Sequence, residues 1–324
     1  MKTFEEILKI IDIQINKIQW QREPKGLYAP IDYVLSLGGK RLRPALTLMA
    51  YNLFADNILP AIYPAIGVEI FHNFTLLHDD IMDKAEVRRG KPTVHKKWNE
   101  NTAILSGDVM QIIAYQYISQ TPPEHLKEVL DIFSKTAEEI CRGQQLDMDF
   151  ESRQNVSTEE YLEMIKLKTA VLLGCAIKIG AIIGNAQNAD CQAMYDFGIN
   201  LGLAFQLKDD WLDVWGNEQT FGKKIGGDIL CNKKTYLLIN ALQLAKGQIG
   251  QELNFLLNTD NILPEDKIRC VIEIFNSLKI KELTEEKINL YYKKSLEHLD
   301  NVKVDSSKKE YLQLLAKELL QRNK

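Results

Sequence analysis

Two short acidic segments, far apart in the chain, have the residue types and spacing to bind a metal ion. Residues 79–83 read DDIMD and residues 209–213 read DDWLD. In each segment the outer carboxylates are four residues apart, so on a helix they lie one turn apart on the same face, where their like charges repel. Mg2+ suits such a pair, because it takes oxygen ligands and is usually held by one or two carboxylates together with substrate phosphates. The two segments therefore predict a site that binds a polyphosphate through Mg2+.

The apolar residues before each segment favour a cleft over an exposed helix face. A single DDxxD on an amphipathic helix is most often a solvated face. Here, however, FTLLH (residues 74–78) precedes the first segment and LAFQL (residues 203–207) precedes the second. Two matching copies at the ends of apolar stretches make the solvated-face interpretation the weaker one.

Short groups of basic residues accompany both acidic segments. Residues 38–44 read GGKRLRP, and Pro44 suits the first turn of a helix, so a loop that enters a helix here would offer backbone N–H groups to an anion. Arg88 and Arg89 follow the first segment, and arginines bind phosphate bidentately. Other cations lie in an apolar helical stretch or after the second segment: Lys168, Lys223, Lys224, Lys233 and Lys234. Each group alone is weak, but together they predict a site for more than one anionic group.

The elements that must position these residues are helices. Apolar residues recur at helical spacing near both ends of the chain, at Phe4, Ile7, Leu8, Ile11 and Ile15 and at Leu312, Leu314, Leu315, Leu319 and Leu320. Alternating runs typical of strands are nearly absent. No linker or low-complexity tract divides the chain, so we expect residues 1–324 to form one domain, an all-α bundle of ten or more helices. Bundles build sites from residues on facing helices, which the two acidic segments would fit.

Composition narrows the class of protein. The net charge is −4 with no basic stripe, which argues against a nucleic-acid partner. Five cysteines lie far apart without a CxxC pair, which indicates neither a zinc site nor a disulfide framework and fits a cytoplasmic protein. The N-terminus lacks the pattern of a secretory signal, and the most apolar window, residues 170–186, is too short and too polar for a membrane span.

One helical stretch before the first acidic segment allows two further interpretations. Glu69 and His72 have the Glu-x-x-His spacing of half a di-iron site, but no other histidine has a glutamate three residues before it, and such a site needs two pairs. Phe71, Phe74 and Leu77 form a stripe that is most simply core. The same stripe could line an apolar channel beneath Asp79.

Seven ordered motifs resemble those of trans-isoprenyl diphosphate synthases. These are GGKRLRP, a histidine seven residues before the first DDxxD, DDIMDKAEVRRGKPTVH, GQQLD, KT, FQLKDDWLD and a Lys-rich loop, and they run from about Leu35 to Tyr236. The resemblance implies the isoprenoid synthase type I fold, a helical bundle around a deep central cavity. It also implies a homodimer.

The resemblance assigns expected roles to matching residues. Asp79 and Asp83 would bind two Mg2+ ions and Asp209 a third, supported by Asp80, Asp210 and Asp213. The allylic diphosphate would be held by Arg88, Lys168, Thr169, Gln206, Lys223 and Lys233. Isopentenyl diphosphate would be held by Lys40, Arg43, His72 and Arg89. Gln144 and Asp147 would support the metals from outside. The groups expected to act most directly in catalysis are Asp79, Asp83, Asp209, Lys168 and Arg88.

The implied reaction is a head-to-tail condensation. Metals and cations would stabilise the charge on the departing diphosphate, the alkene of isopentenyl diphosphate would attack the allylic cation, and loss of a proton would restore a double bond. Residues 216–227 would be a candidate lid. Product length would depend on Phe74, five positions before Asp79, with Phe71 one turn deeper and the small Thr75 beside it. This pattern predicts a C20 product, with C15 nearly as well supported.

Three rival interpretations share part of the pattern. A class I terpene cyclase has the first acidic segment but usually lacks a second DDxxD and has no use for Lys40 and Arg43. A head-to-head synthase has a different set of motifs. A catalytically silent subunit of a heteromeric synthase generally loses an acidic segment, and both are intact here.

Overall fold

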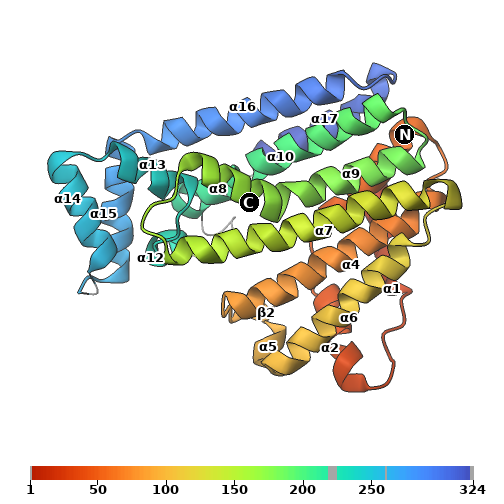
Figure 1. Ribbon diagram of the computed structural model, residues 1–324, viewed down its shortest axis with the longest axis horizontal. Coiled ribbons are helices and arrows are strands. Elements are labelled where there is room, and N and C mark those ends of the chain that lie inside the picture. The colour runs from red at the N-terminus through yellow and green to blue at the C-terminus, as the bar shows by residue number, and fades with distance from the viewer. Residues whose placement is uncertain (1, 218–224, 260, 322–324) are drawn as a thin grey trace. The chain divides into compact units, whose positions relative to one another are not determined.

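A computed structural model describes residues 2–217, 225–259 and 261–321. Within these residues the chain is helical throughout, apart from connecting loops and one small hairpin (Figure 1). The hairpin joins β1 (Val87–Arg88) to the antiparallel β2 (Lys91–Pro92). The prediction of an all-α fold with ten or more helices is confirmed.

The helices form two compact units. Unit 1 contains residues 1–134, 175–194 and 303–311, and unit 2 contains residues 135–174, 195–302 and 312–324. Four helices contribute residues to both units: α7 (Pro123–Ser152), α9 (Val171–Ile183), α10 (Asn188–Trp215) and α17 (Ser306–Gln321). The single domain expected for residues 1–324 stays a prediction.

Unit 1 begins with helices whose starts the sequence encodes. Thr3 caps the first helix, and the Glu6 carboxylate accepts the Thr3 N–H in return. The side chain of Asn99 likewise caps the sixth helix by accepting the N–H of Thr102. The helices of this unit are α1 (Phe4–Asn16), α2 (Lys25–Ser36), α3 (Leu42–Phe54), α4 (Leu59–Met82), α5 (Val94–Lys97) and α6 (Glu100–Ile118).

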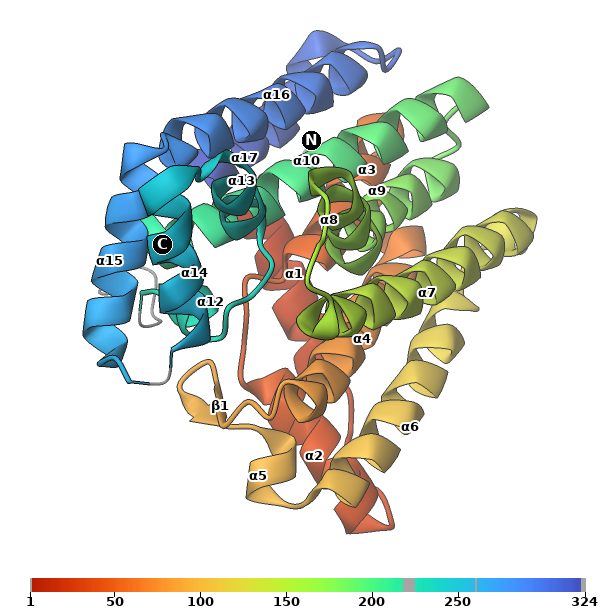
Figure 2. The ribbon, with the colours of Figure 1, turned by 60° about the vertical axis from the view of Figure 1, so that its left-hand side comes forward.

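The central element of unit 1 is α4, which carries the first acidic segment at its C-terminal end. It packs along α6 and α3, and α4 and α6 run side by side (Figure 2). Gly67 allows the close approach, because a Cβ there would lie only 3.0 Å from the backbone oxygen of Ala114 on α6. The buried length of α4 therefore holds its acidic end in place.

Unit 2 includes α8 (Thr158–Ile165), whose start forms a capping box. The Ser157 hydroxyl accepts the N–H of Glu160, and the Glu160 carboxylate accepts the N–H of Ser157. A π-helical turn follows directly, η1 (Lys166–Ala170). The remaining helices are α12 (Gly227–Leu230), α13 (Tyr236–Leu244), α14 (Gly247–Asn258), α15 (Pro264–Ser277) and α16 (Ile280–Asp300). Their apolar faces share one core that includes Leu237, Leu253, Val271 and Phe275.

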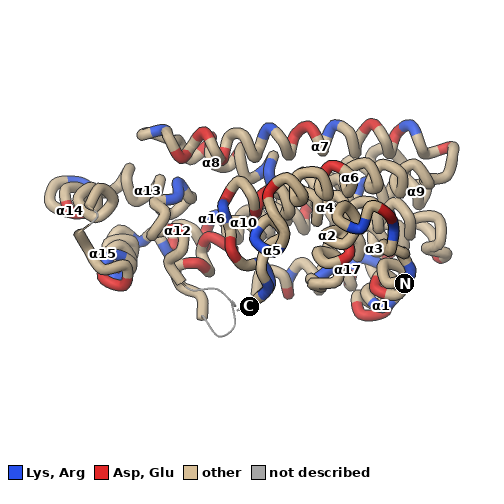
Figure 3. The backbone as a smooth tube through the Cα atoms, turned by 90° about the horizontal axis from the view of Figure 1, so that it is seen from below, with Lys and Arg blue, Asp and Glu red and all other residues tan. Residues whose placement is uncertain are grey.

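Charged residues mark the exposed face of the longest helix, α7. Lys, Arg, Asp and Glu recur along it (Figure 3), and Lys135 pairs with Glu139 one turn away at 3.8 Å. The Lys135 side chain is exposed, whereas only 16% of the Glu139 side chain is exposed. Among the helices that the structure describes, none is long and apolar enough to cross a membrane.

Candidate active site

The end of α4 presents two of the three aspartates of the first acidic segment. The side chain of Asp79 is half-buried, and Asp83, which caps the helix, is exposed. Asp80 is 5% exposed and points inward. The outer carboxylates, one turn apart, can therefore be reached by a cation, whereas the middle one belongs to the interior of unit 1.

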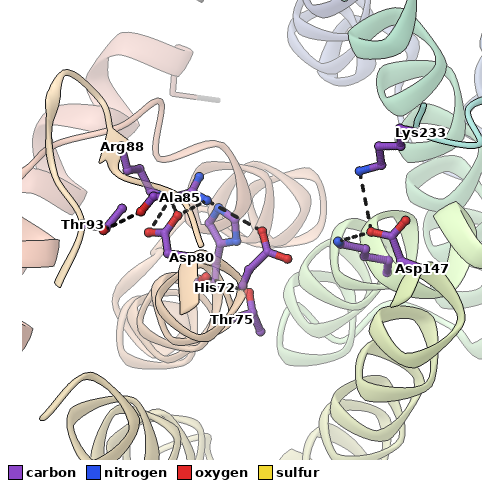
Figure 4. A network of polar contacts seen from close by, with 10 residues as sticks. His72, Thr75, Asp80, Ala85, Arg88, Thr93, Asp147 and Lys233 are labelled. Carbon is purple, nitrogen blue, oxygen red and sulfur yellow. Dashed lines mark hydrogen bonds and ion pairs between the residues drawn. The ribbon is translucent and has the colours of Figure 1, made fainter. Parts of the chain in front are cut away.

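Asp80 is held by Arg88 from the β1 strand. The Arg88 Nε donates to both Asp80 oxygens, at 2.8 and 2.9 Å, and Nη2 lies 2.7 Å from Oδ1 (Figure 4). The same Nη2 lies 3.7 Å from the Asp79 carboxylate. Burial raises the pKa of Asp80, and the Arg88 guanidinium opposes that rise. This geometry favours a supporting role for Asp80 over direct metal binding.

The hairpin also turns Arg89 toward the basic loop of residues 38–44. Arg89 and Gly90 both have positive φ, 53° and 73°, as a two-residue hairpin turn requires. The Arg89 Nη1 then donates to the backbone oxygen of Gly38. Two residues predicted to serve different substrates, Arg88 and Arg89, thus point to different partners.

One cation of the basic loop is structural. Arg41 is 6% exposed, and its guanidinium donates to Glu69 Oε1 at 2.7 Å and to the Leu35 oxygen at 2.6 Å. Asn73 donates to the same Glu69 oxygen at 2.9 Å. Glu69 is therefore committed to Arg41, which removes the remaining support for a di-iron interpretation. Its neighbours Lys40 and Arg43, but not Arg41 itself, were expected to hold isopentenyl diphosphate.

Arg43 and His72, both expected to hold isopentenyl diphosphate, lie together. The Arg43 Nη1 is 3.0 Å from His72 Nε2. Burial, followed by the charges of Arg43 and Arg89, holds the pKa of His72 well below its usual range. His72 is therefore neutral and accepts a hydrogen bond from Arg43, which orients that guanidinium. Lys40, the fourth residue of this group, is exposed.

Aromatic rings line α4 beneath Asp79. Phe74 is 8% exposed and its ring contacts Phe71, with centroids 5.3 Å apart, and His78, at 4.8 Å. Phe71 is buried and also contacts Phe133 at 5.1 Å. Thr75, the small residue beside Phe74, is half-buried and donates to the His72 oxygen at 2.8 Å. Phe74 is thus the phenylalanine of α4 nearest to Asp79 in sequence, and its ring lies between those of Phe71 and His78.

The second acidic segment, at the end of α10 in unit 2, repeats the pattern of the first. Asp209 and Asp213 are half-buried, and Asp210 is 5% exposed. The Asp213 carboxylate accepts the N–H of Asp228 at 3.1 Å. Asp228, which the sequence did not single out, also lines a small pocket with Asp210 and Lys233. The feature of the sequence that could have indicated Asp228 is its position, five residues before the Lys233-Lys234-Thr235 run.

Asp210 accepts hydrogen bonds from two residues. The Tyr161 hydroxyl donates to Oδ2, and Gln206 Nε2 donates to Oδ1 at 3.1 Å. The Thr169 hydroxyl in turn donates to Gln206 Oε1 at 3.2 Å. Burial, together with the charge of Asp228, raises the pKa of Asp210 to about 7. As with Asp80, the surroundings favour a supporting role over direct metal binding.

Asp147 gathers two of the lysines expected to bind the allylic diphosphate. Its Oδ2 lies 2.6 Å from Lys168 Nζ and 3.7 Å from Lys233 Nζ (Figure 4). Burial acts to raise the pKa of Asp147, but the two lysines outweigh it and the pKa is lowered. Asp147, expected to support the metals, thus lies beside two lysines that are expected to bind the allylic diphosphate. Its motif neighbour Gln144 is half-buried on α7.

Two glycines bring Lys168 and Thr169 into position. A Cβ at Gly143 on α7 would lie 2.3 Å from the Lys168 nitrogen, and one at Gly202 on α10 would lie 2.6 Å from the Ala170 Cα. The π-helical turn η1 therefore packs directly against the backbone of α7 on one side and of α10 on the other. Such π-turns are frequent at functional sites. Lys223, Lys224 and most of the candidate lid of residues 216–227 lie outside the described residues.

Replacement of Gly143 by alanine is expected to raise the KM for the allylic diphosphate about tenfold, because the backbone of Lys168 must move away. Gly174→Ala is the matched control, since the atoms nearest to its Cβ would be side-chain atoms of Tyr195 and Ile199, at 3.0 and 3.1 Å, and not backbone. Steady-state kinetics checks this. A Gly143→Ala enzyme with wild-type KM would show that η1 does not depend on this contact.

Comparison with known proteins decides the family. The family model for polyprenyl synthetases matches residues 24–275. The chain belongs to the polyprenyl synthetase family. A geranylgeranyl diphosphate synthase of Methanosarcina mazei is 42% identical over 72% of each chain, and a geranylfarnesyl diphosphate synthase of Natronomonas pharaonis is 40% identical over 68% of this chain and 70% of its own. A crystal structure of a geranylgeranyl pyrophosphate synthase matches 99% of both chains with 43% identity and a TM-score of 0.95.

This polyprenyl synthetase is a prenyltransferase of the geranylgeranyl diphosphate synthase type, in the short-chain trans class, and functions in isoprenoid biosynthesis. Its family uses Mg2+, and its substrates are prenyl diphosphates. The fold expected from the resemblance is confirmed by the match to solved synthases. The two named relatives differ in product, since one is a geranylgeranyl and the other a geranylfarnesyl diphosphate synthase.

Proposed function

We propose that the protein condenses isopentenyl diphosphate head to tail with an allylic diphosphate and releases a C20 product. The carrying observation is the repeated arrangement of the acidic segments. In each, the first and last carboxylates lie a turn apart and can be reached, while the middle one is buried and hydrogen-bonded. Cations that can bind diphosphate are fixed within each unit: Arg88 by Asp80, and Lys168 with Lys233 by Asp147.

The residues fit Mg2+. Asp79, Asp83, Asp209 and Asp213 offer carboxylate oxygens, the donors that Mg2+ prefers. In the described part of the chain, no three His, Cys, Asp or Glu side chains gather into one group, and Mg2+ commonly completes its shell with water and substrate phosphates. We assign two ions to Asp79 and Asp83 and a third to Asp209. When bound, the ions neutralise diphosphate charge and make it a better leaving group.

Three basic side chains assist departure of the diphosphate from the allylic substrate. Arg88 offers a planar guanidinium, and Lys168 and Lys233 offer ammonium groups that Asp147 holds ready. Thr169 and Gln206 are joined by a hydrogen bond and add polar contacts beside Lys168. As the allylic C–O bond breaks, these donors stabilise the negative charge that builds on the oxygen.

A second group of residues holds the nucleophile. Arg43, oriented by neutral His72, together with Arg89 and Lys40, binds the diphosphate of isopentenyl diphosphate. Its alkene then attacks the allylic cation, forming one C–C bond. The proton lost from the adjacent carbon passes to the departed diphosphate, and the electron pair of that C–H bond forms the new double bond. Exclusion of water matters because water would quench the cation.

The position of Phe74 supports a C20 product. It lies five residues before Asp79, about 7.5 Å along the helix axis at 1.5 Å per residue, and the smaller Thr75 beside it leaves Phe74 as the first large barrier. The geranylgeranyl synthases among the relatives agree with this length. C15 and C25 are the alternative lengths that chain-length analysis separates.

We propose that the protein is a homodimer that associates through α6. This helix exposes Ile104, Leu105 and Ile112 at 43%, 58% and 59%, an unusual set of large apolar side chains for one solvated helix. Light scattering should give about twice the chain mass of 37.1 kDa. A mass of one chain at micromolar concentration would refute the dimer.

We also propose a cytoplasmic location, because the five cysteines lie far apart in the sequence without a CxxC pair and indicate no disulfide framework. Fractionation of cells with an antibody to the protein tests this, and recovery with secreted material would contradict it.

The function is tested by incubating the purified protein with Mg2+, isopentenyl diphosphate and each allylic starter, followed by chain-length chromatography. We expect a ladder of products that ends at C20. A cyclised hydrocarbon would indicate a terpene cyclase. Folded protein without turnover on any starter would indicate a silent subunit.

A further inference from the structure

Tyr161 is a buried residue to which neither the motifs nor the family match assigns a task. It lies on α8 with 1% of its surface exposed, and its hydroxyl donates to Oδ2 of Asp210 on α10. Gln206 occupies the other oxygen, Oδ1, at 3.1 Å. The carboxylate of Asp210 is thus held from the protein side at both oxygens.

Neither partner would be stable here alone. A buried tyrosine hydroxyl needs a hydrogen-bond partner, and a buried carboxylate is costly unless it is hydrogen-bonded. A phenylalanine would fill the same space on α8 without a polar group. Burying this hydroxyl and this carboxylate therefore costs free energy that packing alone does not require. A functional role for Asp210 would explain why both groups are present.

The anchored carboxylate sits between the two that can reach a metal. Asp209 and Asp213 flank Asp210 on the last turns of α10, so a fixed Asp210 fixes the rotation of that segment and the face that carries both neighbours. The hydrogen bonds continue from Gln206 to Thr169, which follows Lys168 in η1. One connected series thus joins α8, the acidic end of α10 and the turn that carries a diphosphate-binding lysine.

We propose that Tyr161 is a positioning residue for the second acidic segment, and that it acts through Asp210 to set the Mg2+ affinity of this segment. The inference rests on the proposed function, in which Asp209 binds Mg2+. Residues behind metal ligands commonly change metal affinity by 10–100-fold when they are removed. Tyr161 itself touches neither metal nor substrate in this account.

The test measures Mg2+ binding directly. Wild type and Tyr161→Phe are titrated with Mg2+ in the presence of inorganic diphosphate by calorimetry, and we expect the Mg2+ dissociation constant of the variant to rise about tenfold. Tyr236→Phe is the matched control, since it removes a buried hydroxyl from α13 of the same unit and should leave the constant unchanged. A Tyr161→Phe constant within twofold of wild type would overturn the proposal.

Kinetics separates positioning from general destabilisation. Saturating Mg2+ should restore most of the kcat of Tyr161→Phe, whereas a folding defect would persist at all Mg2+ concentrations. Asp210→Asn supplies a second route: if Tyr161 acts through Asp210, the double variant should bind Mg2+ no more weakly than Asp210→Asn alone. Fully additive losses would refute the link. Wild-type protein that binds Mg2+ and diphosphate but condenses no substrates would refute the proposed function, and the calorimetric comparison would still decide the role of Tyr161.

Discussion

Replacement of Asp79 by asparagine is expected to lower kcat/KM about 1,000-fold. Asp79 is half-buried at the end of α4 and is proposed to bind two Mg2+ ions with Asp83. The amide keeps the size of the side chain but removes its charge, which weakens the stabilisation of the departing diphosphate. A bound metal supplies several kcal/mol of transition-state stabilisation, and we expect about 4 kcal/mol of it to be lost. At about 1.36 kcal/mol per tenfold in rate, this loss corresponds to a factor of about 1,000.

Asp32→Asn is the matched control for this change. Asp32 is exposed on α2, away from the acidic segment. Asp32→Asn is therefore the same chemical change at a position with no proposed metal. Steady-state assays over a range of Mg2+ concentrations compare the two variants, and Asp32→Asn should behave as wild type. An Asp79→Asn enzyme that keeps a tenth or more of wild-type kcat/KM would show that this carboxylate is not a metal ligand.

Replacement of Phe74 by alanine is expected to move the main product from C20 to C25 or longer. Removing the ring opens space beneath Asp79, and Phe71, one turn deeper and buried, becomes the next barrier. Pockets discriminate chain lengths by about 10–200-fold for even one methylene, so the ratio of C25 to C20 should rise at least tenfold. Chromatography of the dephosphorylated products measures that ratio.

Leucine substitutions give the control for packing effects. Phe74→Leu and Phe275→Leu remove ring atoms from two buried positions, one on α4 and one in the core of unit 2. Both should cost stability, but only Phe74→Leu should lengthen the product. Longer products from both variants would attribute the change to a loosened fold, and unchanged products from Phe74→Ala would remove Phe74 as the barrier.

Local patterns in the sequence predicted the helices and the reactive ends well. The apolar spacing of Leu312, Leu315 and Leu319 correctly indicated a buried face. Leu314 was wrongly grouped with them and is 54% exposed. It lies one position away from the buried face. A stretch with so many leucines does not show from the sequence which of them are buried.

The division of work inside each motif could not be predicted. DDxxD spacing gives all three aspartates the same status, whereas burial separates Asp80 and Asp210 from their neighbours. That separation depends on partners supplied by other elements, Arg88 on the hairpin and Tyr161 on α8. Similarly, Lys40, Arg41 and Arg43 are three cations within four positions, and the contact with Glu69 shows that Arg41 is structural.

Close backbone contacts were also beyond the reach of the sequence. Gly143 lies in the GQQLD motif. A side chain is excluded there by the backbone nitrogen of Lys168, which is far along the chain. The π-turn at η1 has no signature in residue type, because an extra residue in a helical turn is set by what packs on both sides. Such features follow from tertiary packing, which periodicity does not encode.

The most direct test of the central claim is the stoichiometry of condensation. Diphosphate release and incorporation of labelled isopentenyl diphosphate are measured together, with an allylic starter, with and without Mg2+. We expect one diphosphate to be released for each isopentenyl unit incorporated, and neither process to occur without Mg2+ or without the starter. Diphosphate release from the allylic substrate without incorporation would contradict it.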